Sequence, residues 1–184
     1  TLALPFLYLN AFSRGFSPGT LAWDIPSAGS DSGLMQAAYQ GPVRLRTALV
    51  NDYLTPANQL INQLGLDTTL TTAWQLGALA QKNTASVGGV QPAGDVLQQY
   101  LTEPASLLSL AHAYATLDHQ GVAAGQEMPT GDGEGAPSLQ PYTVLRVEDD
   151  QHQVLLDWTK PVERAVISAQ LAHLLNHSLS DEVS

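Results

Sequence analysis

The chain has 184 residues, 44% of them hydrophobic, and its 7 basic and 17 acidic side chains give a formal net charge of −10. This charge argues against a nucleic-acid partner, because phosphate neutralisation needs Lys and Arg, and it disfavours contact of this segment with an anionic membrane. No apolar run reaches the roughly 20 residues of a spanning helix, and the absence of cysteine excludes disulfides, thiolate metal sites and a Cys nucleophile. The length predicts one domain over 1–184.

The first half of the chain is predicted to be mainly helical. Helices are predicted over 5–14, from 42 to a pause at Thr55-Pro56, from there to Gly65 and, on weaker patterns, over 71–82 and 94–101. The segment at 21–26 is predicted to be extended, since a turn precedes it and a proline closes it.

The second half carries the strongest helical pattern, at 103–121, with Thr102 as its expected cap and Glu103 and Pro104 in its first turn. The segment 124–140 is rich in Gly, Pro and acidic residues and is predicted to be a mobile loop. Apolar stretches on both sides of a polar turn at 150–152 predict a β-hairpin, and a last helix is predicted after Ser168.

Histidines offer the first candidate chemistry. His173 and His177 are four residues apart on the last predicted helix, and Asp181 continues the same face. No second element supplies a convergent ligand, so we predict a polar helix face and no metal site. We expect His112 to be half-buried and hydrogen-bonded, and His119 and His152 to be exposed.

Three other patterns also have plain structural explanations. Asp132 and Glu134 provide too few oxygens for a calcium loop, and no Gly-Lys-Ser or Gly-Lys-Thr follows Gly88-Gly89, so no calcium site, phosphate cradle or other cofactor is predicted. Thr1 could act as an N-terminal nucleophile. Against this, a helical pattern follows Thr1 in place of a strand, and Lys82 and Lys160 are the only lysines.

Four blocks of sequence, in order and at their separations, resemble the transpeptidase domain of class A penicillin-binding proteins. They are GPVRLRTALVNDYLTPANQLINQLG, SLLSLAHAYATLDHQG, PYTVLRVEDDQHQVLLDW and ISAQLAHLLNHSLSDEV. The resemblance implies acylation of an active-site serine by the D-Ala-D-Ala end of a peptidoglycan stem peptide, or by a β-lactam, followed by transfer to an amine. Such sites use a Ser-x-x-Lys, a Ser-x-Asn and a Lys-Thr-Gly motif.

The resemblance places degenerate motifs in this chain. The segment PFLYLNAF at 5–12 matches the segment that follows Ser-x-x-Lys, which puts Thr1 at the serine position and Leu4 at the lysine position. Pro56-Ala57 anchors the second motif and puts Asp52 at its serine position and Leu54 at its asparagine position. The Lys-Thr-Gly motif is expected after Ser184, beyond this chain, so its absence says nothing about the parent protein. Neither of the two motifs that fall within the chain is intact.

The fold implied by the resemblance is α+β and predominantly helical: the central part of a transpeptidase-like domain with one hairpin. Three functions remain open: an inactive module that binds stem peptides or holds a neighbouring domain, an active acyltransferase with Thr1 as nucleophile and an unidentified base, and a scaffold without a ligand groove. The resemblance also implies an upstream glycosyltransferase domain and an extracytoplasmic location.

Overall fold

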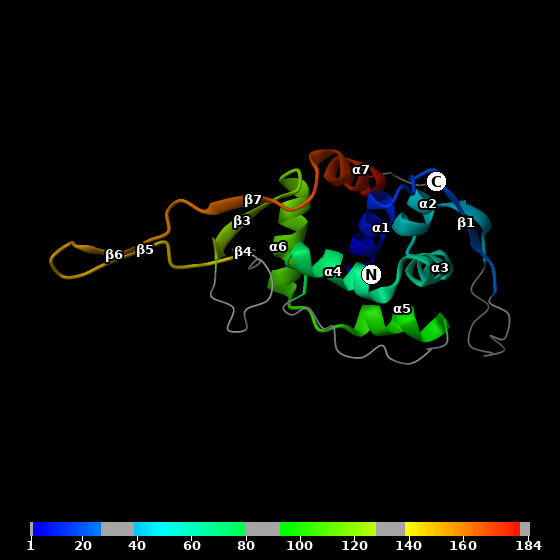
Figure 1. Ribbon diagram of the computed structural model, residues 1–184, viewed down its shortest axis with the longest axis horizontal. Helices are drawn as coiled ribbons and strands as arrows, with labels where there is room; N and C mark the ends of the chain where they lie inside the picture. Colours follow the sequence, from blue (N-terminus) through cyan, green and yellow to red (C-terminus); the bar gives the residue numbers. More distant parts are fainter. Residues whose placement is uncertain (1, 27–38, 80–92, 128–138, 181–184) are drawn as a thin grey trace.

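The computed structural model describes residues 2–26, 39–79, 93–127 and 139–180. These residues form an elongated molecule with a helical body at one end and a narrow β arm at the other (Figure 1). The first and last described helices, α1 and α7, both lie in the helical body, which the arm leaves and rejoins between helices α6 and α7.

Helix α1 (Leu4–Ser13) is the centre of the helical body. Its residues from Leu4 to Phe12 are all buried, and it packs against four other helices: α2 (Leu45–Val50), α3 (Leu54–Leu64), α4 (Leu66–Gln75) and α7 (Ala169–Leu179). A helix that is apolar on all sides is stable only where neighbours cover every side, and LPFLYLNAF is such a sequence. The polar Asn10 inside this helix donates hydrogen bonds to the hydroxyls of Thr68 and Thr69 on α4.

The first half of the chain contains more sheet than its sequence indicated. Strand β1 (Leu21–Asp24), predicted to be extended, pairs antiparallel with β2 (Gly41–Arg44). The prediction of a helix from residue 42 was therefore wrong over its first turn, because backbone pairing with β1 holds 41–44 extended and α2 starts at Leu45. The helix predicted at 71–82 instead spans Leu66–Gln75, and Gly77, with a φ of +81°, follows its end.

The predicted helix at 103–121 is divided between two elements. Thr102 is the last residue of α5 (Ala93–Thr102), where its hydroxyl donates to the backbone carbonyls of Gln98 and Gln99. Helix α6 (Leu107–Asp118) is capped by Ser106, whose hydroxyl accepts a hydrogen bond from the Ser109 N–H. The prediction of Thr102 as the cap was wrong, because a second hydroxyl four residues later has the extended backbone that a cap requires.

The arm contains two small antiparallel sheets. One has the strand order β4-β3-β7, from β3 (Val122–Glu127), β4 (Leu139–Gln140) and β7 (Val162–Ala165); the other is the hairpin of β5 (Arg146–Glu148) and β6 (Val154–Asp157). The hairpin was predicted. The predicted loop at 124–140 is wrong at both ends, where 124–127 and 139–140 pair as strands, while its central residues lie outside the described ones. The α+β, mainly helical fold class is confirmed, with β1–β2 and β4-β3-β7 in addition to the single hairpin expected.

Candidate active site at the start of helix α1

Two of the four motif positions lie in contrasting environments beside α1. Leu4, predicted to stand at the lysine position, is the first residue of α1 and has no exposed surface. Asp52, predicted to stand at the serine position of the second motif, is exposed and lies between α2 and α3 with a φ of +55°. Leu54 begins α3 and is 51% exposed, and Thr1 lies outside the described residues.

Two tyrosines from distant parts of the chain bond to the backbone before α1, and a third tyrosine lies on α1 itself. The Tyr100 hydroxyl donates to the Ala3 carbonyl at 2.6 Å, and the Tyr114 hydroxyl donates to the Leu2 carbonyl at 2.8 Å. Tyr8 lies one turn beyond Leu4 on α1 and is fully buried, and its hydroxyl has no hydrogen-bond partner within the described part of the chain. Hydrogen bonds from tyrosines of α5 and α6 thus hold in place the backbone that leads into α1.

Burial and the charge of Asp52 perturb these hydroxyls. Burial raises the pKa of Tyr8 and of Tyr114 above the ordinary value of 10.0, and the negative charge of Asp52 raises both further. Burial, followed by the neighbouring Tyr114, raises the pKa of Tyr100. The charge that contributes to the pKa shifts of Tyr8 and Tyr114, that of the Asp52 carboxylate, is negative.

The lysine required by the family's chemistry has no counterpart at this place among the described residues. Within 2–26, 39–79, 93–127 and 139–180, Lys160 is the single lysine, and it lies in the arm between β6 and β7. Lys82 lies outside the described residues. The described part of the site therefore offers a carboxylate and three phenols, and no ammonium group.

An apolar pocket of about 260 Å³ opens beside the same entrance. It lies where the first residues of α1 meet the end of α4, the end of α5 and the start of α6. Its lining includes Leu2, Ala3, Phe6, Tyr100, Leu101 and Leu110, with Glu103 as the acidic member. Small apolar groups fit such a pocket better than charged ones.

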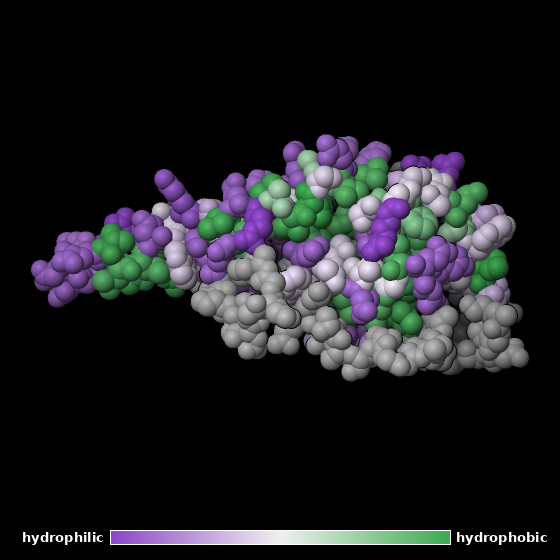
Figure 2. Space-filling view, in the orientation of Figure 1, coloured by the Kyte–Doolittle hydropathy of each residue, from purple (hydrophilic) through white to green (hydrophobic). Residues whose placement is uncertain are grey.

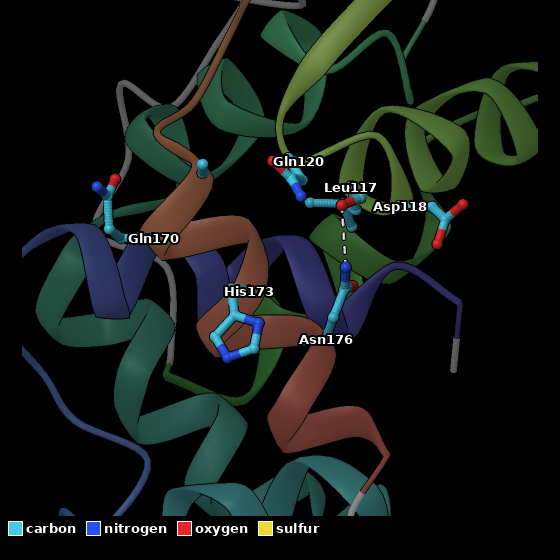
Figure 3. Close-up of a pocket in the computed structure, with 7 residues that line it drawn as sticks. Leu117, Asp118, Gln120, Gln170, His173 and Asn176 are labelled. Atoms are coloured by element: carbon cyan, nitrogen blue, oxygen red, sulfur yellow. Dashed lines mark hydrogen bonds between the residues drawn. The ribbon is translucent and has the colours of Figure 1, made fainter.

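A second, more polar pocket of about 420 Å³ lies between the end of α6 and the start of α7 (Figure 3). The side-chain amide of Asn176 is already hydrogen-bonded, since it donates to the Leu117 carbonyl at 2.9 Å. Gln170 and Asp118 lie on opposite sides of His173 in Figure 3, so the polar groups do not converge on one point. No motif position lines this pocket.

The structure places most of the histidines as predicted. His112 is half-buried and its Nε2 is 2.8 Å from the Ala124 carbonyl, while His119 and His152 are exposed. His173 and His177 share a face of α7 with their rings stacked 6.1 Å apart. Among the described residues no three His, Cys, Asp or Glu side chains form a metal-binding group. Three other sequence candidates lie outside the described residues: Asp181, the acidic pair Asp132 and Glu134, and Gly88-Gly89.

The tyrosines were missed by sequence analysis. Tyr8 carried a local signal, since it follows Leu4 by four residues and so lies on the same helical face. Tyr100 and Tyr114 carried none, because their hydrogen bonds to the start of α1 span 97 and 112 residues of sequence.

A buried central helix enclosed by other helices, with small antiparallel sheets beside them, matches part of the fold of solved penicillin-binding proteins. This match confirms, for the fold, the resemblance inferred from the sequence. Penicillin-binding protein PonA1 from Mycobacterium tuberculosis superimposes with a TM-score of 0.71 at 20% identity, over 96% of this chain and 44% of that one.

Two further solved structures show the same similarity. Penicillin-binding protein A from M. tuberculosis, as its imipenem acyl-enzyme, gives a TM-score of 0.68 at 20% identity over 96% of this chain and 41% of that one. Penicillin-binding protein 1A from Haemophilus influenzae gives 0.66 at 20% identity over 95% of this chain and 28% of that one. The chain thus spans less than half of the length of these proteins.

No protein-family model matches the chain, and no curated protein sequence matches it either. Across the described residues, no helix combines the length and the apolar composition needed to cross a bilayer.

Proposed function

We propose that this chain is part of a penicillin-binding-protein-like module of bacterial cell-wall synthesis, located outside the cytoplasmic membrane, whose transpeptidase site no longer forms an acyl-enzyme. The observation that carries the proposal is the burial of Leu4, with no exposed surface, at the position of the family's lysine. Its aliphatic side chain packs in the core of the helical body and cannot accept a proton.

The expected loss of activity is large. Removing a general base alone costs about 10²- to 10⁴-fold in rate. Asp52 and Leu54 replace both polar groups of the second motif as well, and groups that act together are lost non-additively. The negative charge of Asp52 near Tyr8 and Tyr114 also disfavours the carboxylate of a stem peptide or a β-lactam.

A module that does not form an acyl-enzyme can still bind a stem peptide or support a neighbouring domain. The apolar pocket of about 260 Å³ at the start of α1 suits the methyl side chains at the end of a stem peptide. The same module could hold an upstream glycosyltransferase domain in place, as class A members of the family combine the two.

One observation favours the alternative, an active acyltransferase that uses Thr1. The negative charge of Asp52 contributes to the raised pKa of Tyr114, whose hydroxyl donates to the carbonyl of Leu2, the residue after Thr1. A carboxylate in that place is a candidate for the replacement base. The Asp52→Asn variant separates the two proposals, since it removes a base but leaves the size of the side chain unchanged.

The test is intact-mass analysis after incubation with excess benzylpenicillin, with peptide mapping. Penicillin-binding protein A, which forms a penicillin G acyl-enzyme, serves as the positive control. We expect no adduct on a sample that circular dichroism shows to be folded. A stoichiometric ester on the Thr1 hydroxyl that Asp52→Asn abolishes would overturn the proposal of an inactive site. It would establish an acyltransferase that uses Thr1 as nucleophile and Asp52 as base.

Stem-peptide binding is tested separately by calorimetric titration with an uncleaved pentapeptide that ends in D-Ala-D-Ala. Ala105→Leu narrows the apolar pocket and should weaken binding, while Leu107→Ser, on a nearby side chain that is 76% exposed and outside the pocket, should not. If the pentapeptide does not bind, the scaffolding role is the one that remains.

A further inference from the structure

The β5–β6 hairpin stands away from the rest of the molecule. Figure 1 shows it at the far end of the arm, beyond the β4-β3-β7 sheet, and neither strand packs extensively on a third element among the described residues. We call residues 141–161 the hairpin arm. A two-stranded hairpin alone in water is marginally stable at best, so an arm of this kind is typically completed by a partner surface.

One face of the hairpin arm is apolar. Val147 lies opposite Leu156, and the Trp158 N–H donates to the Leu145 carbonyl, so pleat alternation puts these four side chains on the same face. Tyr142 extends the face, because its ring packs edge-on against Trp158 with centroids 5.6 Å apart. Leu145 is 54% exposed and Val147 38% exposed, which leaves this face open to solvent. Figure 2 shows hydrophobic residues at the surface of the arm among hydrophilic ones.

The opposite face carries charged side chains together with Val154, which lies opposite Glu148 and is 47% exposed, and the turn is acidic. Arg146 lies opposite Asp157, and Glu148, which is ion-paired to Arg146, shares their face. Hydrogen bonds from the side chain and backbone of Thr159 lower the pKa of Asp157, so its carboxyl is ionised at neutral pH. The hairpin arm as a whole has four acidic and two basic side chains, with Asp149 and Asp150 next to each other at the turn.

Both outer edges of the hairpin are open, since its sheet contains only β5 and β6 among the described strands. An extended segment that joins an open edge gains backbone hydrogen bonds, and its alternate side chains fall on the two faces of the enlarged sheet. One set would extend the apolar face of Leu145 and Val147. The other set would lie beside Glu148 and Asp157.

We propose that the hairpin arm binds an extended segment of a partner protein in which apolar side chains alternate with Lys or Arg. Charge decides between this occupant and the two others that an apolar face could take. A second copy of the chain brings the same acidic arm and a net charge of −10, and an anionic membrane surface repels the arm in the same way. A basic and apolar strand complements both faces.

The test uses the whole chain and a fluorescein-labelled decapeptide that alternates Lys with Val or Leu, followed by fluorescence anisotropy. A peptide with Glu in place of Lys and a peptide of the same composition in two blocks serve as matched probes. We expect saturable binding of the alternating Lys peptide, weakened by salt, and much weaker binding of both matched peptides.

Three variants locate the binding site. Leu145→Ser should raise the Kd about tenfold, as for the loss of a buried interface contact. Asp150→Lys, at an exposed turn position that leaves the hairpin intact, should weaken binding at low salt and have less effect at high salt. Leu107→Ser, which removes an exposed apolar side chain from the helical body, is the control and should leave the Kd unchanged.

Several results would overturn the proposal. They are equal binding of the Glu peptide, a Kd that neither arm variant changes, dimerisation of the chain that Leu145→Ser abolishes in analytical ultracentrifugation, and arm-dependent binding to vesicles of anionic lipid. The third result would assign the face to a second copy, and the fourth to a membrane.

Discussion

The helical body and the hairpin arm use similar apolar side chains to opposite effect. In α1 every residue from Leu4 to Phe12 is buried, whereas in the hairpin arm Leu145 and Leu155 are 54% and 67% exposed. Four helices surround α1, and no third layer covers the β5–β6 hairpin among the described residues. Apolar character alone therefore does not predict burial; the number of packed layers does.

The largest effect should come from the centre of the body. Phe6 is fully buried, and its ring centroid lies 5.5 Å from that of Tyr114. We expect Phe6→Ala to lower the free energy of unfolding by about 3–5 kcal/mol, since it leaves a cavity between α1 and α6. Urea denaturation followed by circular dichroism measures this loss. A loss under about 1 kcal/mol would mean that the body is loosely packed around α1.

A smaller effect should distinguish the two hydroxyls near the start of α6. Ser106→Ala removes the N-cap and should cost about 1 kcal/mol. Thr102→Ala removes a hydroxyl bonded within the last turn of α5 and should change stability by less than about 0.5 kcal/mol. Thermal unfolding of the pair checks the boundary between α5 and α6, and the reverse order of effects would restore Thr102 as the cap.

The same substitution, Tyr to Phe, can be compared at two buried tyrosines, one with a hydrogen-bonded hydroxyl and one whose hydroxyl has no described partner. Tyr100→Phe loses the hydrogen bond to the Ala3 carbonyl, which keeps the one that it accepts from the Phe6 N–H, and this loss should cost about 1 kcal/mol. Tyr8→Phe removes a buried hydroxyl that has no described partner, so it should be neutral or stabilising. Equal losses from the two variants in urea denaturation would show that Tyr8 has a partner.

The same tyrosines predict a decline of stability at alkaline pH. Burial raises the pKa of both hydroxyls above 10.0, so the folded state holds their protons more tightly than the unfolded state does. Their contribution is constant below about pH 10 and is lost as the pH rises above that value, because the unfolded chain releases these protons first. The double variant Tyr8→Phe/Tyr100→Phe should flatten this decline in urea denaturation measured from about pH 9 to 11.

The smallest effect should come from the arm. Leu155 is 67% exposed on β6, and Leu155→Ser should change the free energy of unfolding by less than about 0.5 kcal/mol. Amide hydrogen exchange should show β5 and β6 exchanging well before α1, because few apolar contacts hold the hairpin closed. Equal protection of α1 and β6 would mean that the arm is already covered in solution.

Local sequence signals predicted a large part of this molecule. The apolar stretch after Pro5 predicted α1, Ser168 predicted the start of α7, and the apolar stretches around the turn at 150–152 predicted the hairpin. Each signal lies within a few residues of the element that it specifies. The failures are of another kind: β2 needs β1 as a partner across 27–38, and β3 needs β7 across the whole hairpin.

The candidate site divides in the same way. The order of the blocks in the sequence placed Thr1, Leu4, Asp52 and Leu54 at the motif positions, and those assignments stay predictions. What the sequence by itself determined was the mainly helical α+β class and the acidic charge. Only the tertiary structure decided that Leu4 is buried, that Asp52 acts on two tyrosines at the entrance to α1 and that the hairpin stands uncovered, because each depends on contacts between residues far apart in the chain.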